Sequence, residues 1–383
     1  MPAPSSASVE EDENSEERTR ERAVVERLGT GVEPDGFVPF DRFMEIALYA
    51  PGIGYYTGPR SPLGPSGDFY TAPHVHPFFS QALAQRVREV RDRIPDGIPF
   101  RVVELGPGDG TLAAGVVEEL GREPNGGRRY SYVLVERPES LRGAALELAR
   151  TAGVRAGLPV SIGESLGDAG PFVGVVIAHE VMDAQPVRRL VYRNTDWREL
   201  GVRRVGERLV AAESDASRPL PRDPPTNPAE GEVWESAIGR TAILRAISDH
   251  LAGGVAILID YGMSGPELRS AHPTGTLAAI RRHRPVDEPW SHPGRADLSC
   301  FVDFTRVRSE AARFGLRELA YTSQAEALGR WGFQDLLRRA LETAPSSEAR
   351  VRVQLAAKSL LFGFERFQVL ELAPSRDAGF ETR

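Results

Sequence analysis

The stretch FRVVELGPGDGTLAAGVVEEL, residues 100–120, decides the fold of this chain. Its opening residues have strand character, and the residues after the turn repeat apolar side chains at helical spacing. Between the two, Gly106, Gly108 and Gly110 stand at the carboxyl end of the strand. Residues without a Cβ atom allow a sharp backbone turn and the close approach of a ligand. The stretch therefore predicts a strand, a turn and a helix, with a ligand crevice at the turn.

Short apolar runs alternate with helical patterns on both sides of this unit. Further strands are predicted at 131–136, 160–165, 173–180 and 253–262, and helices at 77–94 and 137–152. This alternation is the signature of βαβ units with right-handed crossovers. We therefore expect an α/β fold, with a mostly parallel sheet and helices on both of its faces.

Several segments do not follow the alternation. Residues 40–50 predict an amphipathic helix, and residues 187–214 alternate polar and apolar side chains around a turn at 205–208, which predicts an inserted antiparallel β-meander. Residues 218–232 contain five prolines and predict a loop, and residues 263–300 are irregular.

The composition excludes several classes of protein. Of the 383 residues, 41% are hydrophobic and 26% charged, as in a globular enzyme. The net charge of −7 predicts no nucleic-acid partner and no membrane partner. The single cysteine, Cys300, excludes an internal disulfide and a thiolate metal site. Because the N-terminus is acidic and lacks an apolar targeting segment, we expect a cytoplasmic protein.

The glycine spacing distinguishes between nucleotide-binding motifs. A dinucleotide fingerprint needs a third glycine where Thr111 stands, and no P-loop lysine follows. The observed pattern E-x-G-x-G-x-G, from Glu104 to Gly110, resembles the first motif of class I S-adenosylmethionine (SAM) methyltransferases.

Acidic and polar residues at the next strand ends fit the same donor. Glu136 ends the second strand, where a carboxylate can accept both ribose hydroxyls, and Glu164 and Ser165 end the third, where the adenine would lie. Alone, Glu136 could equally be a solvated helix cap. We predict that the cofactor-binding residues are Glu104, Gly106, Gly108, Gly110, Thr111, Leu112, Glu136, Glu164 and Ser165, with Asp68, Phe69 and Thr71 folding over the donor from a Gly- and Pro-rich loop.

Longer motifs resemble the MidA family of class I SAM-dependent methyltransferases, which includes the mitochondrial complex I assembly arginine methyltransferase. The resemblance covers roughly residues 37–335. It implies a Rossmann-like class I SAM-methyltransferase core, SAM as cofactor, a protein arginine as methyl acceptor and a homodimer. The motifs that carry it are FMEIALYAPGIGYYTG (43–58), GDFYTAP (67–73), VVELGPGDGTL (102–112), VLVERPESLR (133–142), AHEVMDAQPV (178–187), LIDYG (258–262), GTLAAIRRHR (275–284) and GRADLSCFVDF (294–304).

The resemblance and the patterns together predict the domain organisation. The predicted segments are a disordered acidic tail (1–33), an N-terminal helical and loop cover (34–98), a SAM-binding core (99–187), the β-meander with a Pro-rich insertion (188–232), a core helix with the fifth strand (233–262), a substrate-side lid (263–305), and C-terminal helices and strands that complete the core (306–383).

Three positions depart from the family pattern. His74 stands where a glutamate is expected, His179 replaces an asparagine, and Asp109 replaces a common arginine. The two histidines lie on the substrate side, so a small-molecule O- or N-acceptor stays open as an alternative, and a non-catalytic SAM-binding assembly factor is a second alternative. The His74 and His76 pair lacks a third ligand nearby, so we predict no metal site; a histidine could instead act as a base.

Carboxylates after the fourth strand are the candidate catalytic groups. A guanidinium acceptor has a pKa above about 12 and needs a carboxylate to orient it and to help remove a proton. We predict Glu180 as the main substrate-orienting residue and Asp183 as the secondary one; alternatively, both cap a following helix or pair with Arg188. The candidate catalytic residues are Glu180, Asp183, His179 and His74.

Overall fold

A computed structural model describes residues 6–29, 36–58, 72–123 and 130–375. The chain forms two compact units, each assembled from three separate stretches of sequence. Unit 1 consists of Met1–Pro62, Ala184–Gly239 and Pro266–Cys300, and unit 2 consists of Leu63–Asp183, Arg240–Gly265 and Phe301–Arg383.

Unit 2 is built on a central sheet, and the α/β class predicted from the sequence is confirmed. The strand order is β15-β16-β10-β5-β2-β3-β4, and β14 pairs with β10. Strands β4, β3, β2, β5 and β10 are parallel, whereas β16 lies antiparallel to both β10 and β15. The strands are β2 (Phe100–Leu105), β3 (Ser131–Val135), β4 (Val160–Gly163), β5 (Phe172–His179), β10 (Leu251–Met263), β14 (Val302–Asp303), β15 (Leu316–Ser323) and β16 (Phe367–Pro374).

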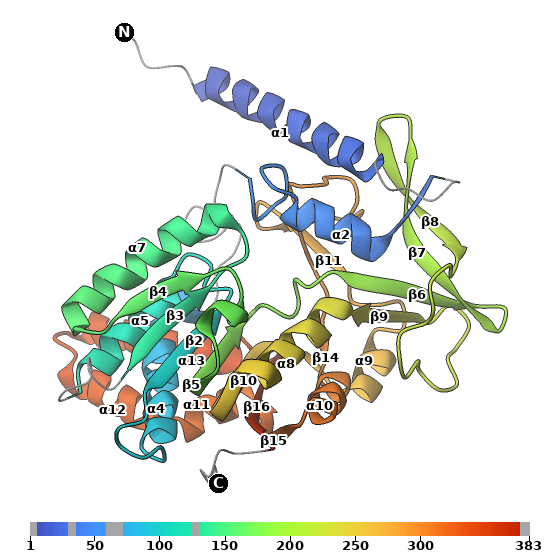
Figure 1. The fold of residues 1–383 in the computed structure, drawn as a ribbon. Helices are drawn as coiled ribbons and strands as arrows, with labels where there is room; N and C mark the ends of the chain where they lie inside the picture. The colour runs from blue at the N-terminus through green and yellow to red at the C-terminus, as the bar shows by residue number, and fades with distance from the viewer. Residues whose placement is uncertain (1–5, 30–35, 59–71, 124–129, 376–383) are drawn as a thin grey trace. The chain divides into compact units, whose positions relative to one another are not determined.

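Helices cover both faces of this sheet (Figure 1). Because side chains alternate along a strand, Val102 and Ile177 join the core under one set of helices, and Val103 and Val176 join the core under the other. The first core is shared with α3 (Ala72–Val75), α4 (Phe78–Arg91), α5 (Thr111–Gly121), α7 (Glu139–Ala156), α11 (Gln324–Arg330), α12 (Phe333–Thr343) and α13 (Ser347–Phe362). The second core is shared with the 3-10 helix η1 (Leu166–Ala169), α8 (Ile238–His250) and α10 (Phe304–Arg313).

Unit 1 contains the predicted β-meander, which is confirmed as an antiparallel sheet. The strand order is β1-β7-β6-β9, and β8 pairs with β7. A two-residue turn at Asn194 and Thr195, with φ of 48° and 70°, joins β6 to β7. The strands are β1 (Phe37–Pro39), β6 (Val187–Arg193), β7 (Asp196–Val205), β8 (Arg208–Asp215) and β9 (Val233–Ala237).

Other parts of unit 1 are more regular than the sequence indicated. Helix α2 (Phe40–Tyr49) matches the amphipathic pattern, but residues 263–300, expected to be irregular, form α9 (Gly265–Ala271), β11 (Ala278–Arg281), β12 (Arg284–Pro285) and β13 (Asp297–Ser299). Helix α1 spans Ser6–Gly29, where we expected a disordered acidic tail. Side chains distant in sequence hold α1, because Glu17 pairs with Arg281, Arg282 and Arg295.

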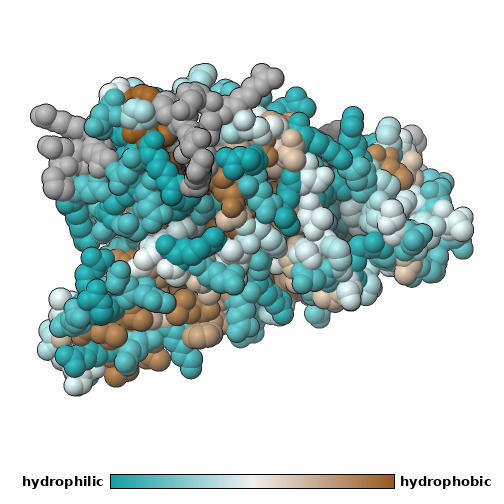
Figure 2. Space-filling model, turned by 90° about the horizontal axis from the view of Figure 1, so that it is seen from below, coloured by the Kyte–Doolittle hydropathy of each residue, from teal (hydrophilic) through white to brown (hydrophobic). Residues whose placement is uncertain are grey.

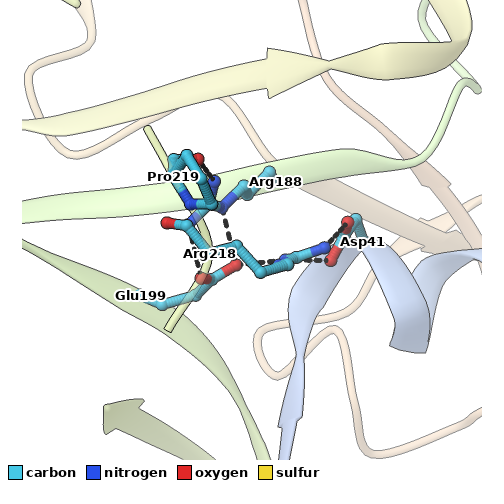
Figure 3. Close-up of polar contacts among 5 residues, drawn as sticks. All are labelled: Asp41, Arg188, Glu199, Arg218 and Pro219. Carbon is cyan, nitrogen blue, oxygen red and sulfur yellow. Dashed lines mark hydrogen bonds and ion pairs between the residues drawn. The ribbon is translucent and has the colours of Figure 1, made fainter. Parts of the chain in front are cut away.

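A network of ion pairs connects the Pro-rich segment to α2 and to the meander (Figure 3). Arg188 of β6 donates two hydrogen bonds to Glu199 of β7, at 2.9 and 2.8 Å. Arg218 contacts the same carboxylate and donates to both oxygens of Asp41 in α2, at 2.7 and 2.9 Å. The carbonyls of Arg218 and Pro219 accept from Arg188. The Pro-rich segment has no regular backbone pairing here, and the guanidinium groups of Arg188 and Arg218 fix its position instead.

Apolar side chains are not confined to the interior of unit 2. Val351, Leu355 and Phe362 of α13 are exposed and lie on one face of that helix. The view from below shows apolar patches among hydrophilic side chains (Figure 2). Across the described ranges, the chain has no helix with the length and apolar character needed to span a bilayer.

Candidate functional site

The glycine turn after β2 is shaped by close backbone packing. Gly106 and Gly110 have φ of 61° and 84°, in the region that favours glycine. A Cβ atom on Gly110 would lie 2.7 Å from the carbonyl oxygen of Ala145 in α7, and one on Gly106 would lie 2.8 Å from Cγ2 of Val181. At these two glycines the turn therefore presents main chain without a side chain, at the N-terminus of α5.

Two buried carboxyl groups flank this turn. The Gly108 N–H donates to Oε2 of Glu136 at 3.3 Å, and the Tyr132 hydroxyl donates to Oε2 of Glu104 at 2.6 Å. Burial raises the pKa of each of these glutamates to about 7. Buried carboxyl groups need hydrogen-bond donors, and the ribose hydroxyls and ammonium group of SAM are such donors. The residues at the turn therefore fit the predicted cofactor.

The polar residues after β4 are partly engaged with each other. Glu164 has a side chain that is 76% exposed and forms an ion pair with Arg142 at 2.8 Å. The N–H groups of Glu164 and Ser165 both donate to Oδ2 of Asp168, at 2.8 and 3.0 Å, and Ser165 caps η1. Asp168 thus uses these two main-chain donors, and both residues of the predicted pair, Glu164 and Ser165, are exposed.

His74 and Asp109, two of the departures from the family pattern, bond to each other. His74 Nε2 lies 2.8 Å from Oδ2 of Asp109, and the Thr111 N–H donates to Oδ1 of the same carboxylate at 3.0 Å. Burial by itself would raise the pKa of Asp109, but these hydrogen bonds lower it below its ordinary value. His74 therefore anchors the glycine turn. The predicted residue Leu112 lies in the hydrophobic core.

A strained turn at the end of β5 holds the main catalytic candidate. Glu180 has φ of 54°, which is unusual for a residue with a side chain, and its N–H donates to the Ile259 carbonyl at 2.9 Å. His179 Nε2 lies 3.3 Å from Oε1 of Glu180. Burial, followed by the charge of His74, lowers the pKa of His179 to about 3. Since this imidazole is neutral at ordinary pH, the contact is not an ion pair.

Asp260, at the end of β10, positions the same turn and was not singled out in the sequence. Its Oδ2 atom accepts from the N–H groups of Met182 and Asp183, at 2.9 and 3.2 Å, while Arg240 Nε donates to the Met182 carbonyl at 2.7 Å. Burial and then the Asp183 charge raise the pKa of Asp260. The signal that could have found it is its place in LIDYG, because β5 and β10 are parallel neighbours and end at one edge.

The two candidate carboxylates differ in accessibility. The residue Asp183 is only 5% exposed, whereas the side chain of Glu180 is 20% exposed. Neither pairs with Arg188, which bonds to Glu199, and the chain after Asp183 enters β6 without a helix that they could cap. The two alternatives considered for these carboxylates, capping a following helix and pairing with Arg188, are therefore wrong.

Asp68, Phe69 and Thr71 lie outside the described residues. His76 Nδ1 accepts from the Phe78 N–H at 3.2 Å, at the start of α4. In the ranges that the structure covers, no three His, Cys, Asp or Glu side chains come together as a metal site would need.

Known proteins resemble this chain over most of its length. The family model described as "Putative S-adenosyl-L-methionine-dependent methyltransferase" matches residues 81–322. A Drosophila melanogaster relative named protein arginine methyltransferase NDUFAF7 homolog, mitochondrial, is 27% identical over 76% of this chain and 71% of its own. The Mus musculus protein arginine methyltransferase NDUFAF7, mitochondrial, is 27% identical over 92% and 84%.

A solved structure is similar to the whole described fold. The crystal structure of a Burkholderia thailandensis protein bound to S-adenosyl-homocysteine is 29% identical to this chain and has a TM-score of 0.82. The similarity covers 99% of this chain and 97% of the other. A native crystal structure from the same organism is 30% identical, has a TM-score of 0.80, and covers 99% and 96%.

Proposed function

The chain belongs to the MidA family of class I SAM-dependent methyltransferases, and from this premise we propose that it transfers a methyl group to a nitrogen of a protein arginine. The finer part of this proposal, the arginine acceptor, has support from the names of the relatives that are 27% identical. The observation that carries it is the carboxylate of Glu180, placed on a strained turn at the carboxyl edge of the parallel sheet.

The donor side of the proposal assigns roles to the glycine turn and its two flanking glutamates. Glu136 would accept hydrogen bonds from the ribose hydroxyls, and the main chain of Gly106 and Gly108 would face the amino-acid end of the donor. Glu104 would lie close to the ammonium group. SAM supplies a methyl group on a sulfonium, which is displaced as a neutral thioether.

The acceptor side assigns the orienting role to Glu180. A guanidinium nitrogen has its lone pair delocalised, so a carboxylate that pairs with one edge localises the charge and exposes a nitrogen to the methyl carbon. A bond forms from nitrogen to carbon, the carbon–sulfur bond breaks, and one proton leaves the nitrogen for Glu180 and then solvent. Asp260 and Arg240 would act as positioning residues, because they hold the main chain of the turn.

Radiolabel transfer tests this function. Purified protein is incubated with cell lysate and tritiated SAM, and labelled proteins are hydrolysed to amino acids. We expect label in protein, recovered as methylarginine. Label in the low-mass extract would instead support a small-molecule acceptor, and absence of label with intact SAM binding would support a non-catalytic assembly factor.

Two variants test the assignment of Glu180. Glu180→Gln keeps the shape of the side chain and removes its charge, so transfer should fall by about a hundredfold or more while affinity for S-adenosyl-homocysteine is retained. Glu147→Gln, an exposed carboxylate on α7, is the matched control and should transfer normally. Equal turnover of Glu180→Gln and Glu147→Gln would refute the assignment.

A further inference from the structure

Four aromatic rings form a row at the edge of the sheet where the proposed chemistry takes place. This aromatic row consists of His179, Phe367, Tyr261 and Phe301, from the end of β5, the start of β16, the carboxyl end of β10 and the segment before β14. The ring centroids of His179 and Phe367 are 6.3 Å apart. Those of Tyr261 and Phe367 are 5.5 Å apart, and those of Tyr261 and Phe301 are 5.4 Å apart.

The aromatic row is continuous with the core but is not itself part of it. Phe367, Tyr261 and Phe301 are half-buried and the His179 side chain is 7% exposed, whereas Phe79, whose ring centroid lies 5.0 Å from that of His179, is fully buried. Folding alone would favour complete burial of large apolar rings. Contiguous rings that remain accessible at the ligand-binding edge of a parallel sheet are typical of a recognition surface.

Charged groups at both ends of the aromatic row indicate which chemistry it recognises. At one end, Oε1 of Glu180 lies 3.3 Å from the His179 ring nitrogen. At the other end, the guanidinium of Arg366 lies 5.7 Å from the centroid of Phe301. A guanidinium is thus already bound over one ring of the row. His179 does not repel cations, because burial holds its pKa at about 3 and keeps the ring neutral.

We propose that the aromatic row is the acceptor-binding surface and takes the planar cation of an arginine side chain, with the Glu180 carboxylate pairing its charge at the end of the row. This inference rests on the proposed function and adds to it the residues that select the acceptor. Aromatic faces attract the delocalised guanidinium cation, and the carboxylate supplies the directional contact that the rings lack. A neutral urea of the same shape gains neither interaction.

Fluorine NMR on the full chain, loaded with S-adenosyl-homocysteine, tests this assignment directly. The protein is produced with 4-fluorophenylalanine, and the Phe301 and Phe367 resonances are assigned from Phe301→Leu and Phe367→Leu. N-acetyl-arginine amide is the probe, and N-acetyl-citrulline amide is its neutral counterpart. We expect the chemical shifts of the Phe301 and Phe367 resonances to change when the arginine probe is added and to remain unchanged with the citrulline probe. Phe100, at the amino end of β2, should not respond.

A pair of variants tests the contribution of the rings to affinity. Tyr261→Leu should weaken probe binding by about twofold to thirtyfold, the range of a cation–π contact. Phe362→Leu, which removes an exposed ring on α13, is the control and should bind the probe normally. Unchanged affinity for S-adenosyl-homocysteine shows that each variant is folded.

The outcomes separate this inference from the proposed function. If the protein labels arginine but neither resonance responds, or if both respond equally to citrulline, the aromatic row is not the acceptor surface and the function stands. If the resonances respond selectively but no label is transferred, the acceptor surface stands and the catalytic proposal falls.

Discussion

The pH dependence of cofactor affinity is the sharpest consequence of the buried Glu136 carboxyl group. Burial raises the pKa of Glu136 to about 7, although the Gly108 N–H bond acts in the opposite direction. In the proposed role, the ionised Glu136 carboxylate accepts hydrogen bonds from both ribose hydroxyls. Binding therefore favours the ionised form, and affinity should increase as pH rises through about 7.

The size of the effect follows from this pKa. The carboxyl group is about one-tenth ionised at about pH 6 and about nine-tenths ionised at about pH 8, so the dissociation constant should be about tenfold higher at the lower pH. Glu136→Gln retains only one acceptor oxygen and no charge. Exchanging charged for neutral hydrogen bonds should lower the plateau affinity by about 1.5–3 kcal/mol, or about tenfold to 150-fold. It should also remove the part of the pH dependence that Glu136 contributes and leave the part that comes from Glu104.

Calorimetric titration with S-adenosyl-homocysteine measures both effects. Repeating each titration in two buffers of different ionisation enthalpy counts the protons released. The unmodified protein should release about half a proton more than Glu136→Gln at about pH 7. Glu104→Gln is the matched control, because burial also raises the pKa of Glu104 to about 7. A flat pH profile in the unmodified protein, or a slope that survives Glu136→Gln and vanishes in Glu104→Gln, would refute the reasoning.

Three further predictions follow from other contacts. Asp260→Asn should lower the rate of methyl transfer by about tenfold to a hundredfold while changing the affinity for S-adenosyl-homocysteine less than about twofold; an equal loss in both would show a general folding defect. The pKa of His179 is lower in the folded protein than in the unfolded chain, so the unfolded chain binds the extra proton and stability decreases as pH falls below about 6.5. The unmodified protein should therefore lose about 2 kcal/mol more than His179→Gln between about pH 7 and about pH 5 in urea unfolding, and parallel losses would contradict this. Arg188→Met should reduce the free energy of unfolding by about 3–5 kcal/mol, because its partner Glu199 is almost fully buried. Arg218→Met should reduce it by only about 1 kcal/mol, because the Arg218 side chain is 39% exposed. The reverse order of the two denaturation midpoints would contradict this ranking.

Local pattern was sufficient for the five parallel strands of the sheet and for the placement of three glutamates at one edge of it. The strand at 100–105, the glycine turn and the helix after it could be predicted because each depends on side-chain periodicity and backbone freedom within a few residues. Glu104, Glu136 and Glu180 could be grouped for the same reason. Each ends a strand, and neighbouring parallel strands end at one edge of a sheet.

The contacts that position those residues depend on tertiary structure. Asp260 bonds to the N–H of Met182 across 78 residues, and His74 reaches Asp109 across 35. Nothing in a local window indicates such a partner, because the partner is determined by how separate elements pack. For the same reason, each unit draws on three separate stretches of chain, which no compositional boundary marks. The sequence by itself determined the donor motif and the strands around it; packing between distant segments decided which side chains surround Glu180 and hold it in place.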